Sequence, residues 1–351
     1  MDTFSAIQAQ KNWHAPKDWI TINTIEMHTG GEPLRVILSG FPAIKGKTVL
    51  ACRNYVKENY DYLRKALMHE PRGHADMYGC LLVPPNDEEG DFGILFLHNE
   101  GYSTMCGHAI IAIATLAIKM GWKEITEPIT ELKIDAPCGR INTYVRVEKK
   151  KVKGVYFHCV PSFVVALDEE VEVEGYRKVK YDLAYGGAFY AYVNADAMHL
   201  PLIPENYGRI IETGMAIKRA IMKSSDKVVH PFEEDLSFLY GTIFIGGPVS
   251  AGIDSRNVCV FAEGEVDRCP TGSGVSGRLP IHFARGKIGL NEQMTIESIT
   301  GSIFKGSIVD TLQYGPFSAV IPQVEGIAYI TGKAQFIIDP NDPFKEGFFL
   351  R

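Results

Sequence analysis

Residues 267–274, Asp-Arg-Cys-Pro-Thr-Gly-Ser-Gly, repeat the layout of residues 105–109, Met-Cys-Gly-His-Ala. Each stretch places one small side chain, Cys106 or Thr271, directly before a glycine and a run with a helical pattern. A second glycine follows fifteen residues after each of these two side chains. This repetition predicts two halves of one duplicated design, in which only one half carries a thiol at this position.

The composition is that of a soluble globular enzyme with room for two domains. The chain has 351 residues, of which 46% are hydrophobic and 22% charged, and its formal net charge is -6. This acidic balance argues against nucleic acids and anionic membranes as partners, and the longest apolar run, 109–118, is too short to cross a bilayer. The seven cysteines form no Cys-x-x-Cys pair and no secretory signal is evident, so we expect a reduced, cytoplasmic chain.

Short strand-like runs rich in Val, Ile, Phe and Tyr dominate the chain. They lie at 19–27, 34–38, 93–98, 132–136, 141–147, 155–160, 183–193, 242–246, 257–261, 293–298, 302–308, 318–321 and 326–338. Helical patterns are fewer and lie at 49–68, 106–120, 204–222 and 274–284. Because strands outnumber helices and many are joined by hairpin-length turns, we expect a mixed α/β fold of the α+β type and not a doubly wound sheet.

We expect two pseudo-symmetric halves that dock directly on one another. The first comprises residues 20–160 plus 326–351, and the second comprises residues 161–325. Each half contains one glycine-led, mostly apolar helix, which predicts a curled, mostly antiparallel sheet wrapped around a central helix. No low-complexity linker separates the halves, so the active site is expected in the cleft between them.

The two helix starts are suited to hold an anion. The first backbone N–H groups of a helix have no intrahelical partner and carry the positive end of its dipole, so two helices starting at one cleft would hold a carboxylate without an arginine. The same field lowers a thiol pKa, which predicts a reactive Cys106. Pro280 lies within the second helical run and is expected to kink it or end it early.

Other interpretations of these motifs are weaker. An isolated cysteine before an apolar helix is more often a small buried hydrophobe, and only the paired stretch favours a function for Cys106. The glycines of 272–277 match the dinucleotide fingerprint, but they do not follow a strand in a βαβ unit. Cys106 and His108 have no second pair with metal-ligand spacing, so we expect no metal. The basic run 149–153 is explained by a solvated hairpin turn.

At these residues the chain resembles the proline racemase family. The similarity extends over about residues 20–340 and is carried by specific motifs, which lie at 28–35, 72–79, 100–102 with 105–108, and 254–274. The family has the diaminopimelate-epimerase-like fold, in which two halves each wrap a curled sheet around a central helix. It uses no cofactor, and two facing cysteines act as base and acid on the α-carbon of a proline-like amino acid.

The resemblance assigns a role to each site residue by its position in these motifs. Cys106 stands at the first catalytic cysteine, and Thr271 stands at the second, because the family's Asp-Arg-Ser-Pro-Cys is Asp-Arg-Cys-Pro-Thr here. His108 and Asp267 match the family's residues that bind the ring nitrogen. Tyr78 and Phe261 match those that pack against the ring. The carboxylate is bound in the family by backbone N–H groups, which correspond here to those of Gly107, His108, Gly272 and Ser273. Cys269, where serine is usual, is expected to face away from the cleft.

Threonine at the second position marks the members that dehydrate trans-3-hydroxy-L-proline, and a homodimer is ordinary in the family. The chemistry agrees, because a threonine hydroxyl is too weak an acid for two-sided proton transfer, whereas elimination needs one base. We expect Cys106 to remove the α-hydrogen and to protonate the leaving 3-hydroxyl on the same ring face, giving Δ1-pyrroline-2-carboxylate through the enamine.

Two alternatives stay open from the sequence. Cys269 would restore a two-thiol epimerase for proline or 4-hydroxyproline if it turned into the cleft. The chain would be a non-catalytic amino-acid-binding protein if it had kept the cleft but lost catalysis together with the second cysteine. A binding protein, however, needs no thiol at position 106.

Overall fold

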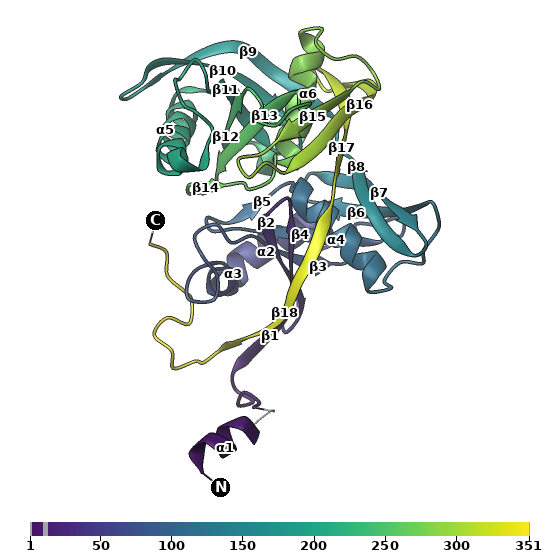
Figure 1. Ribbon diagram of the computed structural model, residues 1–351, viewed down its shortest axis with the longest axis vertical. Coiled ribbons are helices and arrows are strands. Elements are labelled where there is room, and N and C mark those ends of the chain that lie inside the picture. Colours follow the sequence, from purple (N-terminus) through teal and green to yellow (C-terminus); the bar gives the residue numbers. More distant parts are fainter. Residues whose placement is uncertain (1, 10–12, 351) are drawn as a thin grey trace.

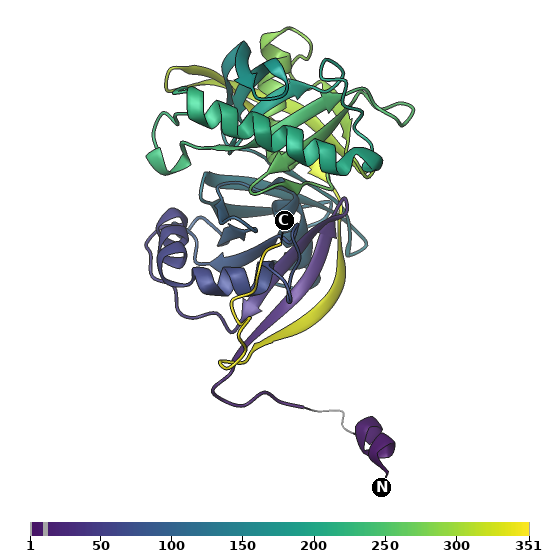
Figure 2. The same cartoon turned by 90° about the vertical axis from the view of Figure 1, so that its left-hand side faces the viewer.

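Two lobes of strands and helices lie one above the other in the computed structural model, which describes residues 2–9 and 13–350 (Figure 1). The lower lobe contains β1 (Ile20–Thr29), β2 (Glu32–Ser39), α2 (Val49–Asn59), α3 (Asp61–Met68), β3 (Gly79–Val83), β4 (Phe92–Leu97), β5 (Tyr102–Ser103), α4 (Gly107–Lys119), β6 (Ile129–Ala136), β7 (Gly139–Glu148), β8 (Lys151–His158) and β18 (Ala328–Ile338). The upper lobe contains β9 (Ser162–Val173), β10 (Arg177–Tyr185), β11 (Phe189–Asn194), η1 (Pro204–Asn206), α5 (Tyr207–Ser224), η2 (Glu234–Leu236), β12 (Leu239–Gly246), β13 (Ser255–Phe261), β14 (Glu265–Val266), α6 (Gly272–Ala284), β15 (Gln293–Glu297), β16 (Ile303–Tyr314) and β17 (Phe317–Gly326). A short helix, α1 (Thr3–Ala9), projects from the lower lobe (Figure 2).

Strand pairing follows the same order in both lobes. In the lower lobe the antiparallel pairs β1–β2, β3–β4 and β6–β7–β8 are joined by parallel steps from β2 to β3 and from β4 to β6. In the upper lobe β10–β11, β12–β13 and β15–β16–β17 repeat this order with the same two parallel steps. A last antiparallel strand completes each set, β18 beside β1 and β9 beside β10. The expected mixed α/β fold of two related, mostly antiparallel halves is therefore confirmed.

The division of the chain into halves stays a proposal, with residues 20–160 and 326–351 in the first and 161–325 in the second. Its support is the pairing of β18 with β1, which returns the end of the chain to the lower lobe. β17 pairs with both β8 and β9 and so joins the two sheets into one hydrogen-bonded network.

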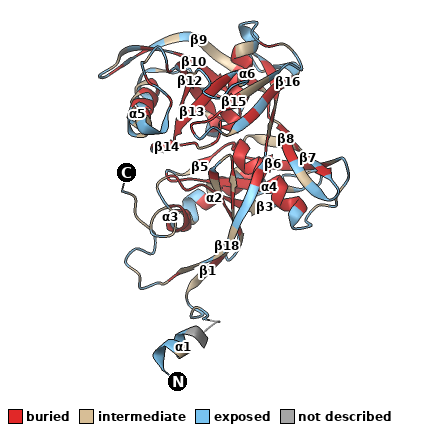
Figure 3. Cartoon of the chain, in the orientation of Figure 1, coloured by how far each residue is buried: buried red, intermediate tan, exposed pale blue. Residues whose placement is uncertain are grey.

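Each half wraps its sheet around one central helix. All residues of α4 from Gly107 to Ile118 are buried, as are those of α6 from Gly272 to Ile281, and both helices lie in the buried interior of their lobes (Figure 3). Pro280 was expected to kink the second helix or end it early; the early end is wrong, because α6 continues to Ala284. A proline removes one backbone donor, and here the surrounding sheet buries the helix around it.

Local differences from the sequence-based expectations are modest. The helical run 49–68 is divided at Tyr60 into α2 and α3, and the run 183–193 contains parts of two strands, β10 and β11. The basic run forms the expected hairpin turn between β7 and β8, with Lys149 and Lys150 at φ 51 and 60. Within the described residues, no helix is long and apolar enough to cross a membrane.

Candidate active site

The two central helices begin at one point between the halves. A Cβ atom added to Gly107 would lie 2.5 Å from the Cα atom of Gly272, and one added to Gly272 would lie 2.6 Å from the Cα atom of Gly107. Only glycine allows this approach, because real Cβ contacts are never so short. The unpaired N–H groups of both first turns are thereby brought to one place, as anion binding requires.

A narrow cavity of about 10 Å³ lies at these helix starts. It is lined by Tyr78, Met105, Cys106, Gly107, His108, Tyr190, Tyr240, Phe261, Asp267, Thr271, Gly272 and Ser273. Every residue that the sequence assigned to the site therefore lines one cavity, while their individual roles remain proposals. Met105, Tyr190 and Tyr240 were missed as site residues. Met105 lies within the motif 105–108, whereas no motif marks Tyr190 or Tyr240.

Cys106 is the N-cap residue of α4, and its Sγ atom accepts a hydrogen bond from the backbone N–H of Ala109 at 3.4 Å. The same sulfur lies 3.1 Å from Nδ1 of His108. Burial raises the pKa of this thiol well above its usual value, and the Ala109 N–H and the Tyr78 hydroxyl offset the effect only in part. The expectation of a lowered pKa is thus wrong for this buried thiol: the helix start acts in the expected direction, but loss of solvent is the larger effect.

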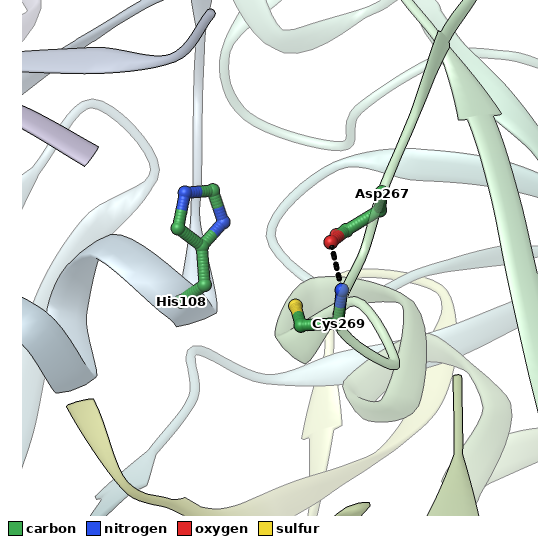
Figure 4. A group of neighbouring side chains, drawn as sticks. All are labelled: His108, Asp267 and Cys269. Carbon is green, nitrogen blue, oxygen red and sulfur yellow. Dashed lines mark hydrogen bonds between the residues drawn. The ribbon is translucent and has the colours of Figure 1, made fainter. Parts of the chain in front are cut away.

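His108 and Asp267 face one another from opposite halves (Figure 4). Burial lowers the pKa of His108 to about 4, so the imidazole is neutral at pH 7 and one of its nitrogens is an acceptor. Asp267 accepts a hydrogen bond on Oδ1 from the backbone N–H of Cys269 at 2.8 Å. A neutral imidazole opposite a carboxyl group is suited to bind a cationic N–H group between them.

Thr271 occupies an unusual position at the start of α6. Its φ angle is +65°, in the left-handed region that a β-branched residue rarely adopts. Unlike Cys106, it does not cap its helix with its side chain, and its buried Oγ1 atom has no hydrogen-bond partner. Burial raises the pKa of the nearby Cys259 thiol, and the Thr271 hydroxyl partly offsets this rise. The hydroxyl and the thiol are close to one another but do not form a hydrogen bond of normal geometry. Strain and an unsatisfied hydroxyl together are typical of a functional position.

Cys269 is buried but does not line the cavity. Its sulfur accepts a hydrogen bond from the backbone N–H of Thr271 at 3.4 Å, beneath the loop that leads into α6. Burial raises the pKa of this thiol well above its usual value. The sulfur is nevertheless within 4.8 Å of a ring nitrogen of His108 and of a carboxylate oxygen of Asp267, so the side chain does not face away from these two cavity residues as expected.

Aromatic rings form the remaining wall of the cavity. The rings of Tyr78 and His108 pack edge to face at 4.8 Å, and the ring of Tyr240 stacks on Phe261 at 5.3 Å. Tyr190 shares a hydrogen bond of 2.7 Å with the hydroxyl of Ser273 in the first turn of α6. These rings exclude water and offer apolar surface to a small ring.

Polar contacts between the halves hold the loop of Asp267 in place. Arg268 donates to Asp76 at 2.7 Å, and Tyr207 donates to the same carboxylate oxygen at 2.8 Å. The backbone N–H of Arg268 donates to the buried Glu32 at 2.7 Å, and burial raises the pKa of this carboxyl well above its usual value. The loop is thus fixed by side chains of the opposite half.

Comparison with known families agrees with this geometry. A family model described as proline racemase matches residues 24–349. The chain belongs to the proline racemase family. Among its relatives, a protein of Colwellia psychrerythraea named trans-3-hydroxy-L-proline dehydratase is 51% identical, over 95% of this chain and 94% of its own length. A protein of Xenopus tropicalis named trans-L-3-hydroxyproline dehydratase is 46% identical, over 96% of this chain and 97% of its own.

Solved structures share the fold of this chain. A hydroxyproline epimerase from Agrobacterium vitis, with bound trans-4-hydroxy-L-proline, superposes with a TM-score of 0.87 at 29% identity, over 94% of this chain and 96% of that one. A phenazine biosynthesis protein of the PhzF family from Bacillus anthracis gives a TM-score of 0.58 at 10% identity, over 91% and 99% of the two chains, which shows a common fold alone. The expected fold class is confirmed by these structures.

Proposed function

We propose that this protein dehydrates trans-3-hydroxy-L-proline to Δ1-pyrroline-2-carboxylate. The observation that carries the proposal is the asymmetry of the two helix starts, where the thiol of Cys106 corresponds to the unpaired hydroxyl of Thr271. One base suffices for an elimination, whereas inversion of the α-carbon needs a proton donor on the opposite face. The names of the relatives support the same reaction.

The cavity has a suitable partner for each part of this substrate. We place the carboxylate at the N–H groups of Gly107, His108, Gly272 and Ser273, where two helix dipoles favour negative charge. The cationic ring nitrogen lies between His108 and Asp267, and the ring carbons lie against Tyr78 and Phe261. No cofactor takes part in this arrangement.

The reaction then proceeds on one face of the ring. The Cys106 thiolate removes the α-hydrogen, and the C–H electron pair forms the double bond as the C3–O bond breaks. In trans-3-hydroxy-L-proline the hydroxyl lies on the same face as the α-hydrogen, so the Cys106 thiol returns that proton to the leaving oxygen, which departs as water. The enamine that remains tautomerises to the cyclic imine. The helix starts stabilise the negative charge that builds up on the carboxylate.

Substrate binding also explains how the buried thiol of Cys106 can act as a base. Desolvation disfavours the thiolate of the buried Cys106. The substrate brings a positive charge next to the sulfur, and an opposite charge within a few ångströms favours the ionised form. The thiolate therefore forms together with the substrate complex.

Because the base form of a high-pKa thiol increases with pH, kcat/KM should rise between pH 6 and 8, by about tenfold per pH unit. The direction follows from the raised pKa of Cys106, since a thiol that is mostly protonated gains thiolate in proportion to hydroxide. Initial rates of imine formation at limiting substrate over this range measure the effect. A flat profile would show that the thiol is already ionised at pH 6.

Incubation of the purified chain with trans-3-hydroxy-L-proline, trans-4-hydroxy-L-proline and L-proline tests the proposal, with the cyclic imine and the chirality of each amino acid as readouts. Imine from the 3-hydroxy substrate, with no inversion of the others, is the expected result. Inversion of L-proline would mean that a second thiol acts as an acid, and Cys269, two residues before Thr271, would be the first candidate. Thermal stabilisation by these amino acids without any product would favour a binding protein.

The setting of the enzyme is part of the same proposal. We place it in the cytoplasm as a homodimer that acts on a small-molecule substrate. The seven free thiols and the acidic net charge of -6 support a reducing compartment and a partner other than nucleic acid or membrane.

A further inference from the structure

The fold supplies a second ligand pair that the sequence spacing does not reveal. Along the chain, Cys106 and His108 have no second ligand pair at metal-binding spacing, but in the folded protein Asp267 and Cys269 lie opposite His108. A ring nitrogen of His108, a carboxylate oxygen of Asp267 and the sulfur of Cys269 all lie within 4.8 Å of one another, and all three residues are buried (Figure 4). The sulfur of Cys106 is 3.1 Å from Nδ1 of His108, on the same side of the cavity as the helix start.

We propose that His108, Asp267 and Cys269 form an inhibitory binding site for a thiophilic divalent cation of the Zn²⁺ type. Binding itself does not depend on the reaction assigned above, whereas the inhibition rests on that proposed function. The ligand chemistry is that of zinc proteins, because imidazole nitrogen, thiolate sulfur and carboxylate oxygen are the three donor types that Zn²⁺ takes. A soft thiolate disfavours Mg²⁺ and Ca²⁺ at the same place.

The distances require only a small closure. Zinc binds sulfur at about 2.3 Å and nitrogen or oxygen at about 2.0–2.2 Å, so the ligand atoms of a tetrahedral site are separated by about 3.3–3.8 Å. The three groups, within 4.8 Å of one another, therefore have to move together by about 1 Å, within the range of side-chain rotation. The Cys269 thiol releases its proton to solvent when it binds and donates a sulfur lone pair to the metal, with no change of oxidation state.

A bound cation would block the site that we assign to the substrate. It would occupy the space between His108 and Asp267, where the cationic nitrogen is placed. Zinc and trans-3-hydroxy-L-proline are thus expected to compete. Cys269, which does not line the cavity, contributes to this site alone and so separates metal binding from catalysis.

Competition with a chromophoric chelator measures Zn²⁺ affinity without any turnover. We expect the wild-type protein, freed of metal, to bind one Zn²⁺ per chain. Cys269→Ser and Asp267→Asn should each weaken Zn²⁺ binding at least about tenfold, because losing a metal ligand should cost no less affinity than losing a residue that hydrogen-bonds to a ligand. Cys52→Ser, which removes a thiol on α2 outside the cluster, is the matched control and should bind as the wild type does. Co²⁺ should give a thiolate charge-transfer absorption in the wild type that Cys269→Ser reduces. Thermal melting confirms that each variant is folded.

Two results would overturn the site: no stoichiometric Zn²⁺ binding by the wild type, or equal affinity in Cys269→Ser and wild type. In the activity assay, Zn²⁺ should inhibit imine formation competitively, EDTA should reverse this, and Mg²⁺ should have no effect. A chain that binds Zn²⁺ through Cys269 but converts none of the three amino acids would contradict the proposed function and leave the metal site standing. A chain that dehydrates its substrate without binding Zn²⁺ would contradict the metal site and leave the proposed function standing.

Discussion

Replacing Cys106 with serine should lower the turnover of trans-3-hydroxy-L-proline by a factor of about 10² to 10⁴ or more, the usual contribution of a positioned base. A serine hydroxyl at this place remains protonated at neutral pH, so the α-hydrogen has no acceptor. The rest of the site should survive, because serine is itself a favourable N-cap residue and can replace the sulfur as acceptor for the Ala109 N–H. Imine formation at saturating substrate, compared with the wild type at equal protein concentration, measures the loss.

Cys52→Ser is the matched control for this change, since it removes a thiol from α2 outside the cavity. It should retain wild-type turnover. Direct binding of the substrate by Cys106→Ser, measured by calorimetry, should persist because the groups that hold the carboxylate and nitrogen are unchanged. Retention of more than a few per cent of activity would exclude Cys106 as the base.

The residues of the site could be found from the sequence because they lie in contiguous motifs. Cys106, Gly107 and His108 are consecutive at one helix start, and the same is true of Thr271, Gly272 and Ser273 at the other. Helix starts have a geometry that short sequences determine, and the repeated spacing indicated that two of them belong together. The structure shows both in one cavity.

Tyr190 and Tyr240 were missed for a different reason. Tyr190 and Tyr240 lie in strands β11 and β12, where a buried aromatic residue is equally well explained by core packing. Whether such a ring meets the cavity depends on strand order and register, which are properties of the whole fold. Their place in the site could therefore not be predicted from local pattern.

Two expectations failed because burial acts over the whole fold. The pKa of Cys106 was expected to fall from the local field of its helix, but desolvation by the surrounding halves raises it. Pro280 was expected to kink its helix or end it early, but α6 continues past it to Ala284. For Cys106 the backbone N–H at the helix start lowers the thiol pKa as expected, and desolvation has the larger effect.

Replacing Thr271 with cysteine should give the enzyme a second acid and let it invert proline-like amino acids. The cysteine sulfur would stand at the start of α6, as the sulfur of Cys106 stands at the start of α4, and would donate a proton to the face opposite the base. The fold should accept the change, since the left-handed φ of +65° is less strained without a β-branch. Exchange of the α-hydrogen of L-proline in D₂O should increase at least about a hundredfold over the wild type, in line with the value of one acid–base group.

Thr271→Ser separates the effect of the thiol from that of side-chain shape. It keeps a hydroxyl, removes the γ-methyl group and relieves the same backbone strain, so it should support dehydration but no inversion. If Thr271→Cys is folded and binds L-proline yet incorporates no deuterium, the single thiol of the wild type is not what restricts it to elimination. If Thr271→Ser inverts L-proline as well, the second proton comes from water or from Cys259, whose thiol lies close to position 271. Only inversion confined to the cysteine variant supports the view that one helix start holds the base and the other has lost its acid.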